Sequence, residues 1–259
     1  MTKNTPELWD SVWESDWAPE QDKYDLAKEE RGIRWRRIER IIREELASFE
    51  GLKVIEIGAG AGTNAALMAK RSATVTLVDY SSKALERARH FFAHNRLEAN
   101  LLREDVLALP DHLLGGFDVA MSFGLTEHFS GDDRLAVNRA HFDLVRPGGL
   151  VFISVPNKWN PPYRIYKLVA QALGRWKVGE EYPYSRRELA RLCEQLGVRQ
   201  YRFFGDSTWG SLRFVNPLRI ASRLRGTAET LDPASLRPER GSFLDPYLAY
   251  ALVLCGKKP

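Results

Sequence analysis

Short apolar runs alternate with charged amphipathic stretches along most of the chain. The apolar runs are rich in Val, Ile, Leu and Phe, which is typical of buried β-strands. They lie at 52–58, 73–81, 100–106, 116–124, 150–156, 198–204 and 247–256. Apolar residues at helical spacing predict helices at 64–71, 82–95, 132–145, 165–176 and 185–196. Strands alternating with helices in this way predict an α/β fold, whose mostly parallel sheet is covered on both faces.

The N-terminal part of the chain has a different pattern. Trp9, Trp13 and Trp17 are spaced four residues apart, so a helix within 1–22 would carry all three on one face. That face either packs on the main domain or forms a lid over a substrate pocket. Isoleucines recur among many charges between residues 25 and 49, which predicts an amphipathic helix.

The strand and helix pattern is also interrupted twice after the run at 150–156. We therefore expect a helical N-terminal segment or lid at 1–50 and one main domain at 51–259. Two insertions in that domain, at about 157–184 and 206–244, are where we expect the substrate to be selected.

Composition and charge restrict the classes of protein that fit. The formal net charge of +4 and the pI near 9.0 are mild for a chain of 259 residues, so no nucleic-acid partner is expected. Cys193 and Cys255 lie far apart and have no metal-ligand spacing, which favours a reducing cytoplasm. No window approaches the roughly 20 apolar residues that cross a bilayer, and we expect no export signal.

A glycine-rich turn follows the first predicted strand. Its pattern is Glu56-x-Gly58-x-Gly60-x-Gly62, and the helix after it would aim free N–H groups at a ligand. A carboxylate in that position disfavours a diphosphate and favours a ligand with a cationic amino group. Thr63 also breaks the glycine spacing of dinucleotide-binding turns.

Asp79 ends the second predicted strand, about 20 residues beyond the glycine turn. An acidic residue in this position can accept hydrogen bonds from both hydroxyls of a ribose. That role is common to adenosine ligands and does not distinguish among them.

The chain resembles the class I S-adenosylmethionine-dependent methyltransferases, in particular those of ubiquinone and menaquinone synthesis. The resemblance covers residues 50–157 and is carried by VIEIGAGAG (54–62), LVDYS (77–81), REDVLALP (103–110), FDVAMSFGLTEHF (117–129) and RPGGLVFISVPN (146–157). It implies a Rossmann-like, doubly wound, seven-stranded sheet that is mostly parallel, with an antiparallel last strand. It also implies S-adenosyl-L-methionine as cofactor and methyl transfer to a small molecule.

The resemblance also implies which residues bind the cofactor. Those expected to do so are Glu56, Gly58, Ala59, Gly60, Gly62, Asp79, Tyr80, Asp105, Val106, Ser122, Phe123 and Gly124. Glu56 and the glycine turn would hold the methionine portion, Asp79 the ribose, and Tyr80 with Asp105 and Val106 the adenine. The residues from Ser122 onward would line the crevice near the sulfonium.

His128 is the candidate catalytic base, because it follows the fourth predicted strand and imidazole accepts a proton near neutral pH. A role in bracing the loop is the alternative. His141 lies in mid-helix and is expected to be structural. Some relatives bind a divalent metal through Glu-x-x-Glu-His at this place, but Gly124 replaces the first carboxylate here. Glu127 and His128 alone make a poor site, so we expect no metal.

We expect the methyl acceptor to rest against the N-terminal segment and the two insertions, on a largely aromatic wall. The candidates are Trp17, Tyr24, Glu127, Trp159, Tyr163 and Tyr184, with Tyr166, Trp176 and Tyr182 in the same aromatic wall. Arg164, Lys167 and Arg175 could pair with an acidic group. The stretch 165–176 also reads as a basic amphipathic helix, which leaves open a peripheral membrane contact and a lipid-like acceptor.

Two other functions stay open at this point. One is an NAD(P)-dependent oxidoreductase, against which Glu56 and Thr63 argue. The other is a module that binds S-adenosylmethionine without catalysis. The run Asn160-Pro161-Pro162-Tyr163 spells a tetrad of nucleic-acid methyltransferases, but it follows the fifth strand instead of the fourth, and we interpret it as coincidence. Oxygen or nitrogen is the favoured acceptor atom, and the sequence predicts no oligomeric state.

Overall fold

A seven-stranded sheet forms the centre of the molecule. The computed structural model describes residues 4–14, 18–176, 178–216 and 232–259. The strands are β1 (Lys53–Ile57), β2 (Thr74–Asp79), β3 (Asn100–Arg103), β4 (Phe117–Phe123), β5 (Val145–Pro156), β6 (Gln200–Gly205) and β7 (Ala251–Lys257). Their order is β3-β2-β1-β4-β5-β7-β6. In this order, the adjacent strands β3, β2, β1, β4 and β5 pair in parallel. β7 runs antiparallel to both β5 and β6. The predicted fold class is therefore confirmed.

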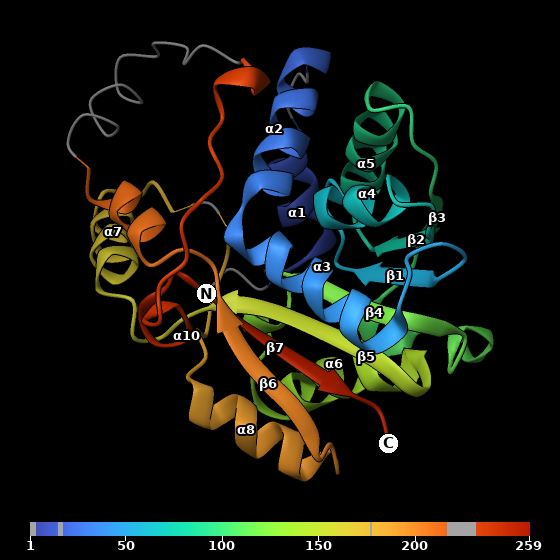
Figure 1. The fold of residues 1–259 in the computed structure, drawn as a ribbon. Helices are drawn as coiled ribbons and strands as arrows, with labels where there is room; N and C mark the ends of the chain where they lie inside the picture. The colour runs from blue at the N-terminus through green and yellow to red at the C-terminus, as the bar shows by residue number, and fades with distance from the viewer. Residues whose placement is uncertain (1–3, 15–17, 177, 217–231) are drawn as a thin grey trace.

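Helices cover both faces of this sheet (Figure 1). They are α1 (Pro6–Trp13), α2 (Pro19–Arg31), α3 (Ile33–Leu46), α4 (Thr63–Ala69), α5 (Ser82–His94), α6 (Gly131–Leu144), α7 (Pro161–Ala172), α8 (Arg186–Gln195) and α10 (Asp245–Leu248). Short 3-10 turns are η1 (Val106–Ala108), η2 (Asp111–Leu113), η3 (Thr126–His128), η4 (Trp209–Phe214) and η5 (Pro233–Ser235). Helix α8 starts with a capping box, since Ser185 and Glu188 bond reciprocally.

Two hydrophobic cores lie on opposite faces of the sheet. One joins α3, α4 and α5 to strand residues such as Val54 and Val119, and the other joins α6 and α8 to their neighbours Ile55 and Ala120. Successive strand residues point to opposite faces, and both faces are dry, so the strands are apolar throughout. This arrangement leaves the ends of the strands as the place for a ligand.

The N-terminal helices differ from the prediction. A single helix between residues 25 and 49 was expected, but the chain breaks at Gly32, where α2 ends and α3 begins. The first helix ends at Trp13, and α2 starts with Pro19 at its first position. Trp17 lies outside the described residues. The apolar face of α3 is buried against the sheet as its pattern predicts.

Three other boundaries were misplaced. β5 begins at Val145, not at 150, because Val145 pairs with Phe117 ahead of a register shift in β4. The last apolar run begins as the short helix α10 before β7 starts at Ala251. α7 begins at Pro161, four residues before the predicted start. Among the described residues, no helix is both long enough and apolar enough to cross a membrane.

Candidate functional site

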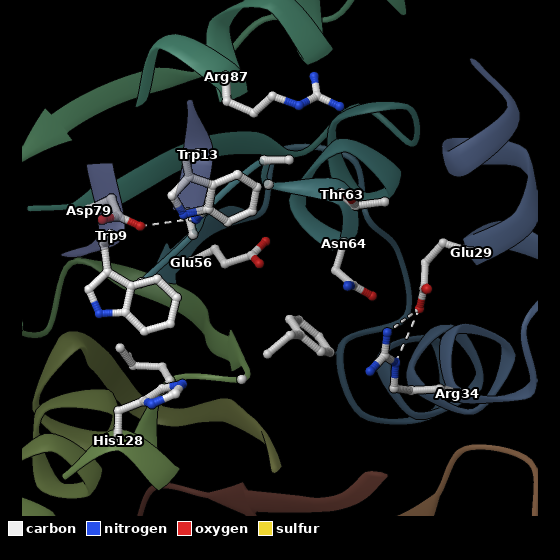
Figure 2. Close-up of a pocket in the computed structure, with 18 of the residues that line it drawn as sticks. Trp9, Trp13, Glu29, Arg34, Glu56, Thr63, Asn64, Asp79, Arg87 and His128 are labelled. Atoms are coloured by element: carbon white, nitrogen blue, oxygen red, sulfur yellow. Dashed lines mark hydrogen bonds and ion pairs between the residues drawn. The ribbon is translucent and has the colours of Figure 1, made fainter. Parts of the chain in front are cut away.

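A cavity of about 1500 Å³ opens at the carboxyl ends of the parallel strands (Figure 2). Its lining comes from the glycine turn after β1, the end of β2, the end of β4, the N-terminal helices and both insertions. Figure 2 draws Glu56 in the middle of these residues, with Trp9, Trp13 and His128 on one side and Arg34 and Glu29 on the other. Parallel strands of this kind bind ligands at this edge of the sheet.

The glycine turn is shaped by its backbone. Gly58, Gly60 and Gly62 have φ angles of +60°, +54° and +68°, a conformation that other residues rarely adopt. A Cβ atom on Gly62 would lie 2.7 Å from Leu77 Cδ1, so this glycine also allows close packing on β2. All three glycines and Ala59 line the cavity, directly before the N-terminus of α4.

Glu56 is buried beneath this turn. Its Oε2 accepts a hydrogen bond of 2.9 Å from the backbone N–H of Ala65 in α4. Burial raises the pKa of the Glu56 carboxyl to about 8, against the lowering effects of the Ala65 hydrogen bond and of the Arg34 charge. A cation that enters the cavity beside Glu56 would stabilise the ionised form of this carboxyl group.

Asp79 fixes the turn from the end of β2. Its Oδ2 accepts from Gly60 N and its Oδ1 from Ser81 N, both at 3.0 Å. Burial raises the pKa of the Asp79 carboxyl, and these backbone hydrogen bonds oppose that rise. Both oxygens are therefore held in one orientation at the cavity wall.

The expected adenine-side residues also line the cavity. Tyr80, Asp105 and Val106 are all among its lining residues. Asp105 has a structural role as well, because its Oδ1 accepts from Leu107 N at 2.9 Å and so caps η1.

At the end of β4 the expected residues are divided between two environments. Phe123 and Gly124 line the cavity, but Ser122 does not. The Ser122 side chain points to the opposite face of the sheet, where its hydroxyl lies 2.8 Å from His141 Nε2. His141 Nδ1 lies 2.8 Å from the carbonyl of Val137, and burial lowers the pKa of His141 to about 4.

His128 reaches the cavity from η3. Its Nδ1 lies 2.8 Å from the carbonyl oxygen of Glu180. A carbonyl only accepts hydrogen bonds, so Nδ1 carries the proton and Nε2 keeps its lone pair. Burial lowers the pKa of His128, which keeps the ring neutral at pH 7. The Trp9 ring stands edge-on to it at 4.8 Å between centroids.

A second carboxylate joins the Glu127-His128 pair, which the sequence did not reveal. Glu181, from the first insertion, brings its ligating atom within 4.8 Å of those of Glu127 and His128. The Glu181 carboxylate is already bonded to the Tyr163 hydroxyl and lies 3.3 Å from Lys167 Nζ. Glu127 is buried, and its Oε2 has no partner in the described part of the chain. The expected absence of a metal stays a prediction.

The aromatic wall predicted for the acceptor is not the one in the structure. Tyr163 and Tyr184 are buried away from the cavity, Trp159 is exposed outside it, and Tyr24 is not among the lining residues. Glu127 is also outside the lining, and of the predicted aromatic set Tyr182 lines the cavity whereas Tyr166 and Trp176 do not.

Local structure explains why these tyrosines turn inward. The N-cap of α7 at Asn160, whose Oδ1 accepts from Tyr163 N, directs Tyr163 toward Phe214 in η4. Tyr184 is held by a 2.9 Å hydrogen bond from Asn138 Nδ2 to its hydroxyl and by the Arg134 guanidinium over its ring. The Asn160-Pro161-Pro162-Tyr163 run is therefore a helix start.

Several lining residues were not among the individual candidates, although most of them lie in the N-terminal segment or the second insertion. They are Glu29, Arg34, Trp209, Arg213, Phe214 and Tyr250. Arg34 Nη2 pairs with Glu29 Oε1 at 2.8 Å, and its guanidinium carbon stands 5.1 Å from the Phe123 ring centroid. Neither contact follows from sequence spacing, because the break at Gly32 brings the two charges together.

Helix α1 covers the glycine turn. The Trp13 ring packs directly on Gly60, where a Cβ atom would lie 2.5 Å from Trp13 Cζ2. Asp10 Oδ1 accepts from the Ser81 hydroxyl at 2.6 Å, and Asn4 Nδ2 donates to the His128 carbonyl at 2.7 Å. Both tryptophans that the structure describes in this segment therefore belong to the cavity wall.

Comparison with known proteins agrees with this geometry. A family model described as a methyltransferase domain matches residues 54–149. The ubiquinone biosynthesis O-methyltransferase of Neisseria meningitidis serogroup C (strain 053442) is 33% identical over 162 residues, which cover 59% of this chain and 66% of that protein. The enzyme of the same name from Azotobacter vinelandii (strain DJ / ATCC BAA-1303) is 36% identical over 118 residues, covering 46% of this chain and 50% of that one.

Solved structures show the same fold at low sequence identity. Magnesium protoporphyrin IX methyltransferase from Synechocystis PCC 6803, with bound S-adenosylhomocysteine, has a TM-score of 0.56 at 12% identity and covers 98% of this chain and 93% of its own. The methyltransferase domain of a bacterial Hen1 protein has a TM-score of 0.56 at 18% identity, covering 88% and 98%.

The sheet order, the glycine turn with its buried carboxylate and the matching family model define a class. The chain carries a methyltransferase domain over residues 54–149, and its fold is that of the class I S-adenosylmethionine-dependent methyltransferases. The matched stretch spans between half and two thirds of the length of the two curated relatives.

Proposed function

We propose that this protein transfers a methyl group from S-adenosyl-L-methionine to a small-molecule acceptor. The observation that carries the proposal is Glu56, a buried carboxyl group facing the cavity beneath a glycine turn. A cationic amino-acid group beside Glu56 restores the charge that burial suppresses, whereas a diphosphate would be repelled.

The residues around the turn fit this cofactor. Gly58 and Gly60 line the part of the cavity beside Glu56 where the methionine portion would lie, and Asp79 would accept hydrogen bonds from the ribose hydroxyls. Tyr80 and Asp105 line the wall where adenine would lie. Bound S-adenosylmethionine supplies a methyl group on a positively charged sulfur, which is electrophilic without further activation.

His128 would act on the acceptor. Its neutral ring and unprotonated Nε2 suit a base that takes the proton of an acceptor hydroxyl or ammonium group. The carbonyl of Glu180 accepts a hydrogen bond from Nδ1–H and so fixes the tautomer of the His128 ring. The cavity walls exclude water and align the acceptor, which supplies the rest of the rate.

The variant His128→Ala tests this role. We expect affinity for S-adenosylhomocysteine, measured by calorimetry, to stay nearly unchanged and turnover to fall by about 10²-fold. His112→Ala, an exposed histidine in η2, is the matched control and should keep full turnover. Unchanged turnover in His128→Ala would remove it as the base. A protein that binds NAD but not S-adenosylhomocysteine would contradict the proposal as a whole.

We propose that the two insertions select the acceptor and that its reacting atom is oxygen or nitrogen. Tyr182 and Glu180 from the first insertion, and Trp209 and Phe214 from the second, support this role because they line the cavity. The names of the two curated relatives favour a hydroxyl acceptor. A cytoplasmic location is also proposed, and the buried free thiols of Cys193 and Cys255 are consistent with it.

A further inference from the structure

The outer faces of α7, η4 and α10 expose large apolar side chains. On and just after α7 these are Ile165, Leu168, Val169 and Leu173, with 54%, 64%, 53% and 61% of their surface exposed. On and just after η4 they are Trp209, Leu212 and Val215, and on α10 they are Tyr247 and Leu248. We call these nine residues the apolar face. The spacing on α7 places its four side chains on one side of that helix, and a three-residue spacing does the same on η4.

The three elements form one continuous unit, seen at the left of Figure 1. The inward side of α7 packs on η4, with Tyr163 and Tyr166 5.7 Å and 5.5 Å from the Phe214 ring centroid. Asn160 Nδ2, at the N-cap of α7, donates to the Leu248 carbonyl of α10 at 2.7 Å. On α7 the tyrosines thus supply the inner packing, while the aliphatic side chains face outward.

The sequence stretch that carries α7 has charges of one sign. No Asp or Glu occurs from residue 158 to residue 179, whereas that stretch contains Lys158, Arg164, Lys167, Arg175 and Lys177. Lys158 lies 3.8 Å from Glu188 and Lys167 3.3 Å from Glu181, so the exposed charges that carry the argument are those of Arg164 and Arg175. A helix with an apolar side and only basic charges is complementary to an anionic lipid surface, where apolar side chains enter the acyl boundary and cations pair with headgroups.

We propose that the apolar face docks on an anionic lipid bilayer. The face borders the cavity, because Trp209 and Leu212 belong to both. Docking would therefore bring the cavity mouth to the membrane surface, where an apolar acceptor is concentrated. The inference concerns binding alone, and it stands without methyl transfer because it is measured without cofactor or acceptor.

The test is co-sedimentation of the full chain with vesicles of phosphatidylcholine alone or mixed with phosphatidylglycerol. We expect binding to the mixed vesicles, at least tenfold weaker binding to phosphatidylcholine alone, and weaker binding as salt is raised. Leu168→Asp and the double variant Arg164→Glu, Arg175→Glu should each lower the affinity about tenfold or more. Leu114→Asp and Arg40→Glu are matched controls on exposed residues of η2 and α3, and should bind like the unchanged chain.

Each variant must keep its thermal unfolding temperature, which its exposed position predicts. The proposal is overturned if the mixed vesicles do not sediment the protein, or if Leu168→Asp binds as well as Leu114→Asp. It is also overturned if light scattering shows a dimer that Leu168→Asp dissociates, since the face would then be covered by a second copy of the chain. A failure of vesicle binding leaves the His128 and S-adenosylhomocysteine experiments untouched, so the two proposals fail separately.

Discussion

We expect Glu56 to control which ligands the cavity binds, because the charge of its carboxyl group would depend on the ligand beside it. With a pKa of about 8, the carboxyl is mostly protonated at pH 7 when no cation is present. A ligand ammonium group needs the carboxylate, so its binding below pH 8 releases a proton. We expect the affinity for S-adenosylhomocysteine to rise by up to about tenfold per pH unit between pH 6 and pH 8.

Glu56→Gln should abolish this pH dependence and weaken binding by about tenfold or more, since the charge is lost while the Ala65 hydrogen bond can be kept. Calorimetry in two buffers with different ionisation enthalpies measures the released proton directly. Glu104→Gln, another carboxyl group in the cavity lining, is the control and should keep the slope. A slope that survives in Glu56→Gln would assign the proton to another group.

The positions of single site residues could be predicted where the residue directly follows the end of a strand. The glycine turn, Asp79 and His128 follow the carboxyl ends of parallel strands, and these ends must meet at one edge of the sheet. Ser122 could not be placed in this way. Successive side chains of β4 point to opposite faces of the sheet, so the face that Ser122 occupies does not follow from its distance to the strand end. Glu181 is brought in by a fold of the insertion that no local pattern indicates.

Helix α1 is an element with little burial of its own that nevertheless forms part of the site. None of its residues is buried, and it is held by the contacts of Asp10, Asn4 and Trp13. Because the Trp13 ring lies over Gly60, it covers the part of the cavity where the methionine portion would lie. We therefore expect α1 to act as a lid that slows ligand release.

Trp13→Ala should therefore raise the dissociation rate of S-adenosylhomocysteine by about tenfold, with a smaller change in the association rate. Stopped-flow displacement measures both rates. Trp159→Ala removes a tryptophan that is 58% exposed outside the cavity and should change neither rate. Equal dissociation rates in the Trp13→Ala variant and the unchanged chain would show that α1 is packing without a gating role.

Elements could be predicted wherever their apolar side faces the sheet. α5, α6 and α8 have one dry side against the sheet, and their residue patterns located them within a few residues. α7 and η4 instead pack on each other through aromatic rings, while their aliphatic residues face outward. Their apolar pattern therefore indicates a helix but not its orientation, which is why several predicted acceptor residues lie outside the cavity lining.

The fold of the whole molecule could be predicted because its signals are redundant. Several strand and helix units repeat the same alternation, so misplaced boundaries such as the start of β5 did not alter the topology. The break at Gly32 was not predictable from periodicity, since both α2 and α3 continue an amphipathic pattern. Its consequence is large, because it delivers Glu29 and Arg34 to the cavity.

Buried acids also determine how the stability of the whole molecule depends on pH. Burial raises the pKa of Glu56 and Glu127 to about 8, far above the value near 4.5 that they have when unfolded. Between these values the folded chain holds protons that the unfolded chain has released, so stability falls as pH rises. His141, with a pKa lowered to about 4, has the opposite effect, but that effect ends near pH 6.5.

The free energy of unfolding should therefore fall by about 3 kcal/mol between pH 6.5 and pH 8, as urea titrations at both pH values would measure. Glu127→Gln should reduce this fall in stability both with and without S-adenosylhomocysteine. Saturating S-adenosylhomocysteine should remove the part that belongs to Glu56, because a bound ammonium group makes its carboxylate the stable form. A fall that the ligand leaves unchanged, while Glu127→Gln still reduces it, would mean that the ligand's cation does not lie beside Glu56.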